Sequence, residues 1–326
     1  IRGVQDLKAN EFDPAGLCVE IYLLDPDIIR QVPSDDLVRG ILEDLISVND
    51  DGSELVLSAS QEENKPIATE INIDAKEKSL ELMKTEIVSS YLNGYDTINI
   101  MFESNNNDAP KIKDVIRNLS GLEIMEQTST RIVAKNLINI NEISLSNIIR
   151  RMDIITRAMI EDAILCLTGQ CSYDSIHSRD VDINRLYFLG YRVIKNGMKN
   201  PRIAKSLGIA PWQMHSDTLM LLRIERIADS QKRIARYLQA INFDRAALND
   251  LNKIHSDISE AYNNVMKAYY NKDKKLALSI EVTNKDRTSV CDKFLESYTQ
   301  SHTNTKNKNF HSSLVMVAKI IENLKT

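Results

Sequence analysis

Two polar pairs at helical spacing are the residues of this 326-residue chain best suited to chemistry. Asp180 and Asn184 form the first pair, and Glu225 and Asp229 form the second. Residues four apart on an α-helix lie one turn from each other on the same face, so each pair presents two oxygen-bearing side chains together. If the two helices pack side by side in opposite directions, the four side chains converge. The sequence therefore predicts a metal site with Asp180, Asn184, Glu225 and Asp229 as ligands.

The ligand types limit the choice of ion. Carboxylate and amide oxygens favour hard cations, so we expect iron, Mg²⁺, Mn²⁺ or Ca²⁺ at this site, and not zinc or copper(I). His177, one turn before Asp180, could add a nitrogen ligand, whereas Asp182 points elsewhere on the helix. A plainer interpretation stays open, in which Asp229 forms a surface ion pair with Arg233 at i, i+4 spacing and no metal is bound.

The same residues resemble the signature of a protein family. Segments 178–186 (SRDVDINRL) and 223–235 (RIERIADSQKRIA) are similar to the two signature helices of the PhoU family of phosphate-uptake regulators. That family typically reads D-x-x-[IV]-N/D-x-L-E on one helix and L-E-R-I-G/A-D-x-A-x-x-I-A on the next. Tyr187 stands where the family usually has Glu, which removes one ligand from the family's set. PhoU relatives are associated with iron and other divalent ions.

The resemblance implies a cytoplasmic, non-enzymatic regulator of phosphate uptake and phosphate signalling. It would bind metal, form a homodimer, and contact the ATPase of a phosphate transporter or a signalling kinase. The sequence agrees in having no G-x-S-x-G, no H-E-x-x-H and no phosphate-binding G-x-x-x-x-G-K-[ST] motif. We therefore expect no enzymatic activity.

Residues 141–326 must position these side chains, and their apolar pattern is helical throughout. We expect six helices, at about 144–167, 173–199, 211–240, 245–270, 272–299 and from 310 onward. An apolar stripe at three- and four-residue steps runs along the third helix, through Met220, Ile224, Ile227, Ile234 and Leu238.

An internal likeness divides the six helices into two halves. Segment 215–225 can be aligned with 311–321, which predicts two three-helix repeats. By resemblance, this is the PhoU architecture. In that alignment Glu225 falls on Ile321 and Asp229 on Lys325, so the second repeat lacks the acidic pair. We expect metal in the first three-helix half only.

Residues 61–140 read β-α-β-α-β-β, which predicts a ferredoxin-like domain. The expected strands are 66–73, 97–102, 122–127 and 130–136, and the expected helices are 76–92 and 109–119. The phrases at 91–98 and 120–124 resemble the middle segment of archaeal PhoU-like regulators.

Residues 1–60 are β-rich, with expected strands at 17–24, 45–48 and 54–57 and a turn at 49–52. This segment resembles a degenerate AbrB/SpoVT DNA-binding domain, because aspartates stand at 23–28 where that family has Lys and Trp. This segment contains thirteen acidic side chains and only four basic ones, which disfavours binding to a phosphate backbone. The alternative hypothesis is still an AbrB-type transcription regulator whose helical part senses phosphate or metal.

Composition supports an α+β chain with long helices, since 43% of residues are hydrophobic, 27% are charged, and only 10 Gly and 7 Pro are present. No apolar run approaches the roughly 20 residues of a membrane span. Four scattered cysteines lack any zinc spacing, so we expect them to be reduced thiols. They are Cys18, Cys166, Cys171 and Cys291.

Overall fold

The computed structural model describes residues 46–50, 55–59, 69–76, 78–102, 108–241, 243–302 and 310–325. The chain forms two compact units, Ile1–Ile67 and Ala68–Thr326. In the first unit, β1 (Ile46–Asp50) and β2 (Leu55–Ala59) pair as an antiparallel hairpin, with Val48 opposite Leu57. The predicted hairpin is therefore confirmed. The strand expected at 17–24 and the aspartate-rich phrase at 23–28 lie outside the described residues.

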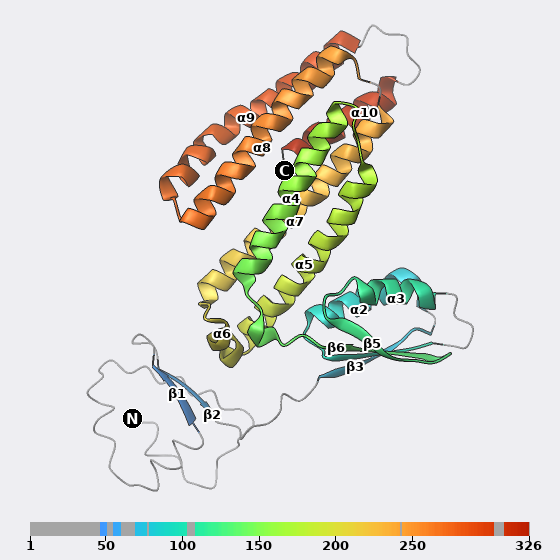
Figure 1. Cartoon of the computed structure of the whole chain (residues 1–326), viewed down its shortest axis with the longest axis vertical. Coiled ribbons are helices and arrows are strands. Elements are labelled where there is room, and N and C mark those ends of the chain that lie inside the picture. Colours follow the sequence, from blue (N-terminus) through green and yellow to red (C-terminus); the bar gives the residue numbers. More distant parts are fainter. Residues whose placement is uncertain are drawn as a thin grey trace. The chain divides into compact units, whose positions relative to one another are not determined.

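The second unit begins with a four-stranded sheet and two helices. Its elements are β3 (Glu70–Asp74), α2 (Leu80–Leu92), β4 (Thr97–Met101), α3 (Ala109–Arg117), β5 (Leu122–Gln127) and β6 (Arg131–Asn136). The strand order is β3-β4-β6-β5, and α2 and α3 cover one face of the sheet (Figure 1). The central strand β4 buries Ile98 and Ile100 completely, in one apolar core with Met83 and Ile87 of α2.

The predicted order of strands and helices is confirmed. The structure shares with a ferredoxin-like fold the layer of two helices on one face of a four-stranded sheet, but it differs in the order of the elements. A ferredoxin-like fold follows the order β-α-β-β-α-β. Here β3 and β4 are parallel neighbours joined by α2, whereas β4–β6 and β5–β6 are antiparallel. A helical crossover between two neighbouring strands makes them parallel, because the chain returns to the same edge before the second strand begins.

Six long helices follow, close to the predicted bounds. They are α4 (Leu145–Leu167), α5 (Tyr173–Lys199), α7 (Pro211–Ala240), α8 (Arg245–Asn271), α9 (Lys274–His302) and α10 (Phe310–Leu324). A 3₁₀ turn, η2 (Ile140–Glu142), precedes them, and the short α6 (Pro201–Leu207) was not predicted. Side-chain caps start two of them, with Ser144 accepting from the Asn147 N–H and Asp244 from the Ala247 N–H.

Helix α7 is the centre of the helical part and packs against α4, α5 and α10. Its predicted apolar stripe is buried at Ile224, Ile234 and Leu238, while Met220 and Ile227 are partly buried. Helix α8 packs on α4 and α9, and α9 also packs on α10. The division of these helices into two repeats stays a prediction.

A disulfide joins Cys166 at the end of α4 to Cys171 just before α5. The expectation of reduced thiols is therefore wrong for this pair. Gly169, with a φ of +84°, allows the tight turn that returns the chain so soon after α4. Cys291 is a buried free thiol, and Cys18 lies outside the described residues.

Among the described residues, none of the helices combines the length and the apolar character needed to cross a lipid bilayer.

Candidate functional site

The two predicted helix faces meet, and a lysine lies between them. Helices α5 and α7 are neighbours (Figure 1), and Lys232 of α7 bridges their acidic side chains. The Lys232 Nζ lies 2.6 Å from Asp180 Oδ2 on α5 and 3.0 Å from Asp229 Oδ1 on α7. The convergence expected from the i, i+4 spacing is therefore present, with an ammonium group at the centre.

Asn184 and Glu225 belong to the same neighbourhood. The Asn184 amide donates to Asp180 Oδ2 at 3.3 Å. Burial raises the pKa of Glu225, the negative charges of Asp229 and Asp180 raise it further, and Lys232 opposes them. Within the described part of the chain, the Glu225 carboxylate has neither an ion pair nor a hydrogen bond. Asp180, Asn184, Glu225, Asp229 and Lys232 together are called the acidic cluster below.

Lys232 holds this cluster together as a charged group. Burial lowers the pKa of Lys232, but its hydrogen bonds and the charges of Asp180 and Asp229 outweigh burial and raise the pKa overall. Asp180 is only 4% exposed. A carboxylate at that depth is costly unless it is paired, so the Lys232 ammonium and the Asn184 amide are what make its burial tolerable.

Asp229 also pairs with Arg233, as the plainer interpretation of the sequence expected. Its carboxylate is therefore shared between Arg233, half exposed at the helix surface, and Lys232, which faces α5. The predicted pair of Asp229 with Arg233 is therefore present, and the second oxygen of the same carboxylate contacts Lys232.

In this arrangement an ammonium group stands where a metal ion would have to bind. Mg²⁺ or Ca²⁺ would need oxygens at about 2.0–2.6 Å, and the Lys232 ammonium occupies the space beside the oxygens of Asp180 and Asp229. No group of three or more His, Cys, Asp or Glu side chains in the described ranges is arranged to hold a metal. The predicted metal site stays a prediction, and it requires Lys232 to leave.

The other candidate ligands lie apart from the cluster. His177 is exposed and stacks on Tyr173, with ring centroids 6.1 Å apart. Asp182 is exposed, as its position on the helix predicted. Arg179, adjacent to Asp180 in sequence, forms an ion pair with Asp162 of α4.

Sequence reasoning missed the role of Lys232, although a signal for it exists. Glu225, Asp229 and Lys232 follow at i, i+4 and i+7, which places the lysine on the acidic face of α7. A lysine three residues after an acid most often forms a surface pair. What the spacing does not show is that its long side chain also reaches α5.

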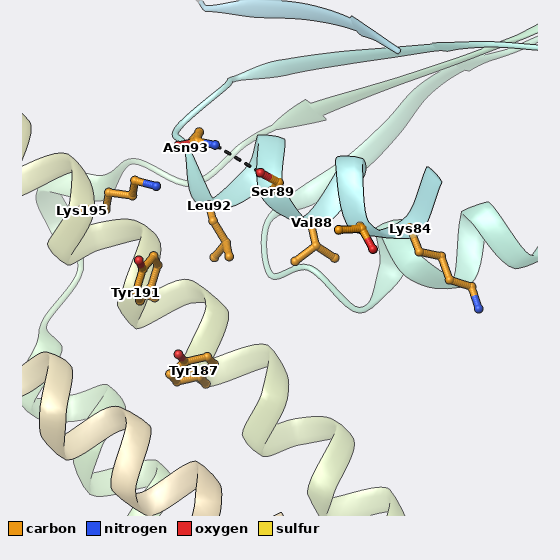
Figure 2. Close-up of a pocket in the computed structure, with 9 residues that line it drawn as sticks. Lys84, Val88, Ser89, Leu92, Asn93, Tyr187, Tyr191 and Lys195 are labelled. Carbon is orange, nitrogen blue, oxygen red and sulfur yellow. Dashed lines mark hydrogen bonds between the residues drawn. The ribbon is translucent and has the colours of Figure 1, made fainter. Parts of the chain in front are cut away.

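A second feature, unforeseen from the sequence, is a cleft between α2 and α5 with a volume of about 540 Å³. Side chains spaced four apart on each helix face it, and Figure 2 shows Val88 and Leu92 of α2 pointing toward Tyr187 and Tyr191 of α5. The lining, called the α2–α5 cleft below, consists of Lys84, Thr85, Val88, Ser89, Leu92, Asn93, Tyr187, Tyr191 and Lys195. Tyr187, which follows the segment 178–186 in sequence, is thus a cleft residue.

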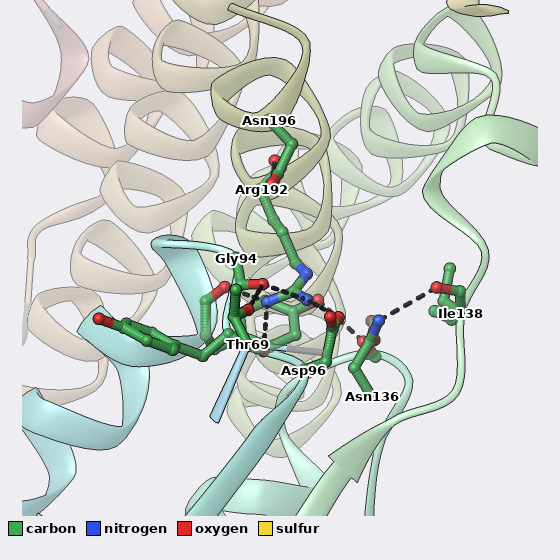
Figure 3. Close-up of polar contacts among 10 residues, drawn as sticks. Thr69, Gly94, Asp96, Asn136, Ile138, Arg192 and Asn196 are labelled. Carbon is green, nitrogen blue, oxygen red and sulfur yellow. Dashed lines mark hydrogen bonds and ion pairs between the residues drawn. The ribbon is translucent and has the colours of Figure 1, made fainter. Parts of the chain in front are cut away.

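Arg192 fixes one end of this cleft by joining α5 to the loop after α2 (Figure 3). Its side chain is 1% exposed, and its guanidinium donates to the carbonyl oxygens of Tyr91, Gly94 and Tyr95, the last at 3.1 Å. It also lies 3.3 Å from Asp96 Oδ1 and stacks 4.8 Å from the centre of the Tyr91 ring. Planar guanidinium groups suit such multiple contacts, which a lysine could not reproduce.

Comparison of the chain with protein-family models, curated proteins and solved structures finds no match.

Proposed function

We propose that this chain is a PhoU-like regulator of phosphate uptake and phosphate signalling that acts through contacts with other proteins. The proposal is supported by the sequence resemblance of segments 178–186 and 223–235. One structural observation carries it further: the two helices that contain these segments are neighbours, and Asp180, Glu225 and Asp229 converge between them. Convergence of this kind is what the family pattern requires of its signature helices.

The proposed role is that of an adaptor without catalytic activity of its own. It would work as a homodimer in the cytoplasm and bind the ATPase of a phosphate transporter or a signalling kinase. The surface beside the acidic cluster carries Arg226 and Arg233, which suits contact with an acidic protein surface. Rim charges of this kind set the rate and specificity of association more than its strength.

Metal binding enters the proposal as an exchange. A hard cation ligated by Asp180, Asn184, Glu225 and Asp229 would take the place of the Lys232 ammonium, because two positive charges cannot share these oxygens. Titration with Mn²⁺ tests this exchange. The variant Lys232→Met removes the competing charge, so it should bind Mn²⁺ more tightly than the unmodified protein.

Lys253→Met is the matched control for that titration, because Lys253 forms an exposed pair with Asp250 on another helix, α8. It should leave Mn²⁺ binding unchanged. Equal Mn²⁺ affinity in Lys232→Met and Lys253→Met would remove metal from the proposal.

Phosphate uptake in the source cells tests the function itself. Deletion of the chain should change the rate of phosphate uptake when external phosphate is varied. The unmodified chain should restore normal uptake, and the double variant Asp180→Asn, Glu225→Gln should restore it incompletely. Uptake that is the same with and without the chain would refute the proposal. Tight sequence-specific DNA binding at low salt would replace it with the transcription-regulator hypothesis.

A further inference from the structure

The α2–α5 cleft has the composition of a small-molecule site. Its volume of about 540 Å³ falls within the range of roughly 300–1,000 Å³ typical of such sites. One wall, from α2, presents the apolar side chains of Val88 and Leu92. The other, from α5, presents the rings of Tyr187 and Tyr191, whose centroids lie 6.2 Å apart. Apolar walls with flat rings favour a ligand that has a planar body.

Three hydrogen-bond donors in the cleft make no hydrogen bond or ion pair within the described part of the protein. The hydroxyl groups of Tyr187 and Tyr191 make no hydrogen bond there, and the Lys195 ammonium has no carboxylate beside it. Lys195 instead lies 5.8 Å from the centre of the Tyr191 ring. Tyr187, Tyr191 and Lys195 are spaced four apart on α5, so their polar ends follow one another along one face of the helix.

The ionised side chains that line the cleft are positive, and the negative charge of Glu225, outside the lining, acts on Tyr187. Lys84 and Lys195 are the only ionised lining residues of the cleft, and none of its lining residues is an acid. Lys84 contacts the exposed Glu81 at 2.9 Å, an i, i+3 surface pair that is weak in water. A bound anion would therefore contact Lys195 in preference to Lys84, which lies at the opposite end of the cleft (Figure 2).

One end of the cleft is held in place by Arg192 in the absence of a ligand. Arg192, the neighbour of Tyr191, donates to the carbonyls of Tyr91, just before Leu92, and of Gly94 and Tyr95, just after it. Gly94, at a φ of +94°, lies so close to Asn196 that an added Cβ would come within 2.6 Å of its Oδ1. A wall held this firmly loses little freedom on binding, which favours affinity.

We propose that the α2–α5 cleft binds a small planar anion, of the size and chemistry of a nucleoside monophosphate. The ring system lies between Val88 and Leu92 on one side and the two tyrosine rings on the other. The anionic group accepts from the Lys195 ammonium and the Tyr191 hydroxyl. The proposal does not depend on the proposed regulatory function, and no residue of the acidic cluster lines the cleft, although the charge of Glu225 acts on Tyr187.

Calorimetric titration of the full chain with adenosine monophosphate tests the site. Adenosine, which has the ring system without the charge, and ribose 5-phosphate, which has the charge without the base, separate the two contributions. The monophosphate should bind at least about tenfold more tightly than either fragment, since only it uses both walls and Lys195. Binding of the monophosphate no tighter than that of ribose 5-phosphate, or no binding at all, would overturn the proposal.

Three variants locate the site. Lys195→Met should weaken binding of the monophosphate about tenfold, the usual worth of a charge-assisted hydrogen bond, and leave adenosine unaffected. Lys199→Met, one turn further along α5, is exposed and outside the cleft, so it should change neither affinity. Ser89→Phe, at an exposed lining position, should fill the cleft and abolish binding. Equal effects of Lys195→Met and Lys199→Met, or full binding by Ser89→Phe, would place the ligand elsewhere and refute the proposal.

Discussion

Replacing Lys232 with methionine is the sharpest test of how α5 and α7 are held together. Methionine keeps most of the volume and the helix propensity of lysine and removes only the charged end. The buried Asp180 carboxylate would lose the ammonium at 2.6 Å and keep a single amide hydrogen bond from Asn184 at 3.3 Å. Asp229 would keep Arg233. The loss therefore falls on Asp180 and on Glu225, which keeps only the opposing charge of Arg226.

The expected cost follows from the burial of the pair. Removing one partner of a buried ion pair costs roughly 3–5 kcal/mol, because the other charge is left without compensation. The Lys232 side chain is 22% exposed and Asn184 remains, so we expect the lower end, about 3 kcal/mol. Lys253→Met breaks a 3.6 Å pair whose side chains are 78% and 60% exposed, and should cost less than about 0.5 kcal/mol.

The loss should also depend on pH. Lys232 opposes the burial and the neighbouring charges that raise the pKa of Glu225, so its removal should raise that pKa further. A carboxyl group whose folded pKa is raised binds more protons in the folded than in the unfolded state. The stability of Lys232→Met should consequently fall as the pH rises above the ordinary glutamate value of 4.5.

Urea denaturation followed by circular dichroism measures these free energies. Adding Asp180→Asn to Lys232→Met removes the stranded charge and should restore roughly 2 kcal/mol, whereas Asp180→Asn alone should destabilise the protein. If Lys232→Met costs no more than Lys253→Met, the ammonium does not hold the helices together. The same conclusion follows if Asp180→Asn changes the unfolding free energy by the same amount in the unmodified protein and in Lys232→Met.

Three further predictions concern the helical part. Glu225→Gln should stabilise the protein at pH 7 by about 0.5 kcal/mol and give no gain in stability at pH 4. The reason is that burial and the charges of Asp229 and Asp180 raise the pKa of Glu225. An equal gain in stability at both pH values would contradict this. Burial lowers the pKa of His255 from 6.5 to about 4, so the stability that depends on its neutral form should be lost as the pH falls through this window, by up to about 3 kcal/mol. In His255→Gln, the urea midpoint should no longer fall as the pH is lowered through this window. If the midpoint of the variant still falls as steeply, other groups cause the loss of stability. Reduction of the Cys166–Cys171 disulfide should lower the unfolding free energy by about 2 kcal/mol, with no effect of reductant on Cys166→Ser; equal sensitivity of the two proteins would contradict it.

The helices were predictable because their signals are long and consistent. Helix α7 begins at Pro211, a residue favoured in the first turn, and its apolar stripe continues at helical period for about five turns, from Met220 to Leu238. Helix α5 was equally clear between the turn near Gly169 and Asn200. Helix α6 was missed because its seven residues are too few to show a period.

The contents of the site were harder to predict than its position. Spacing along a helix determines which side chains share a face, so i, i+4 counting gave the polar face of each helix, and the packing of α5 on α7 brought the two faces together. Spacing does not determine how far a flexible side chain reaches across to another helix, so Lys232 was not foreseen. The disulfide between Cys166 and Cys171 was not predicted for a related reason. The separation of Cys166 and Cys171 is compatible with a bond only once the turn at Gly169 has its particular backbone conformation.

The position of Arg192 limits how this protein can be divided. A fragment that ended near residue 140 would contain the whole sheet but lose the guanidinium that satisfies the carbonyls of Tyr91, Gly94 and Tyr95. Water would have to replace it against the ring of Tyr91, and the isolated sheet would fold less stably than its own core suggests. A protease that cut between β6 and α4 should, for the same reason, yield two pieces that stay associated until denaturant is added.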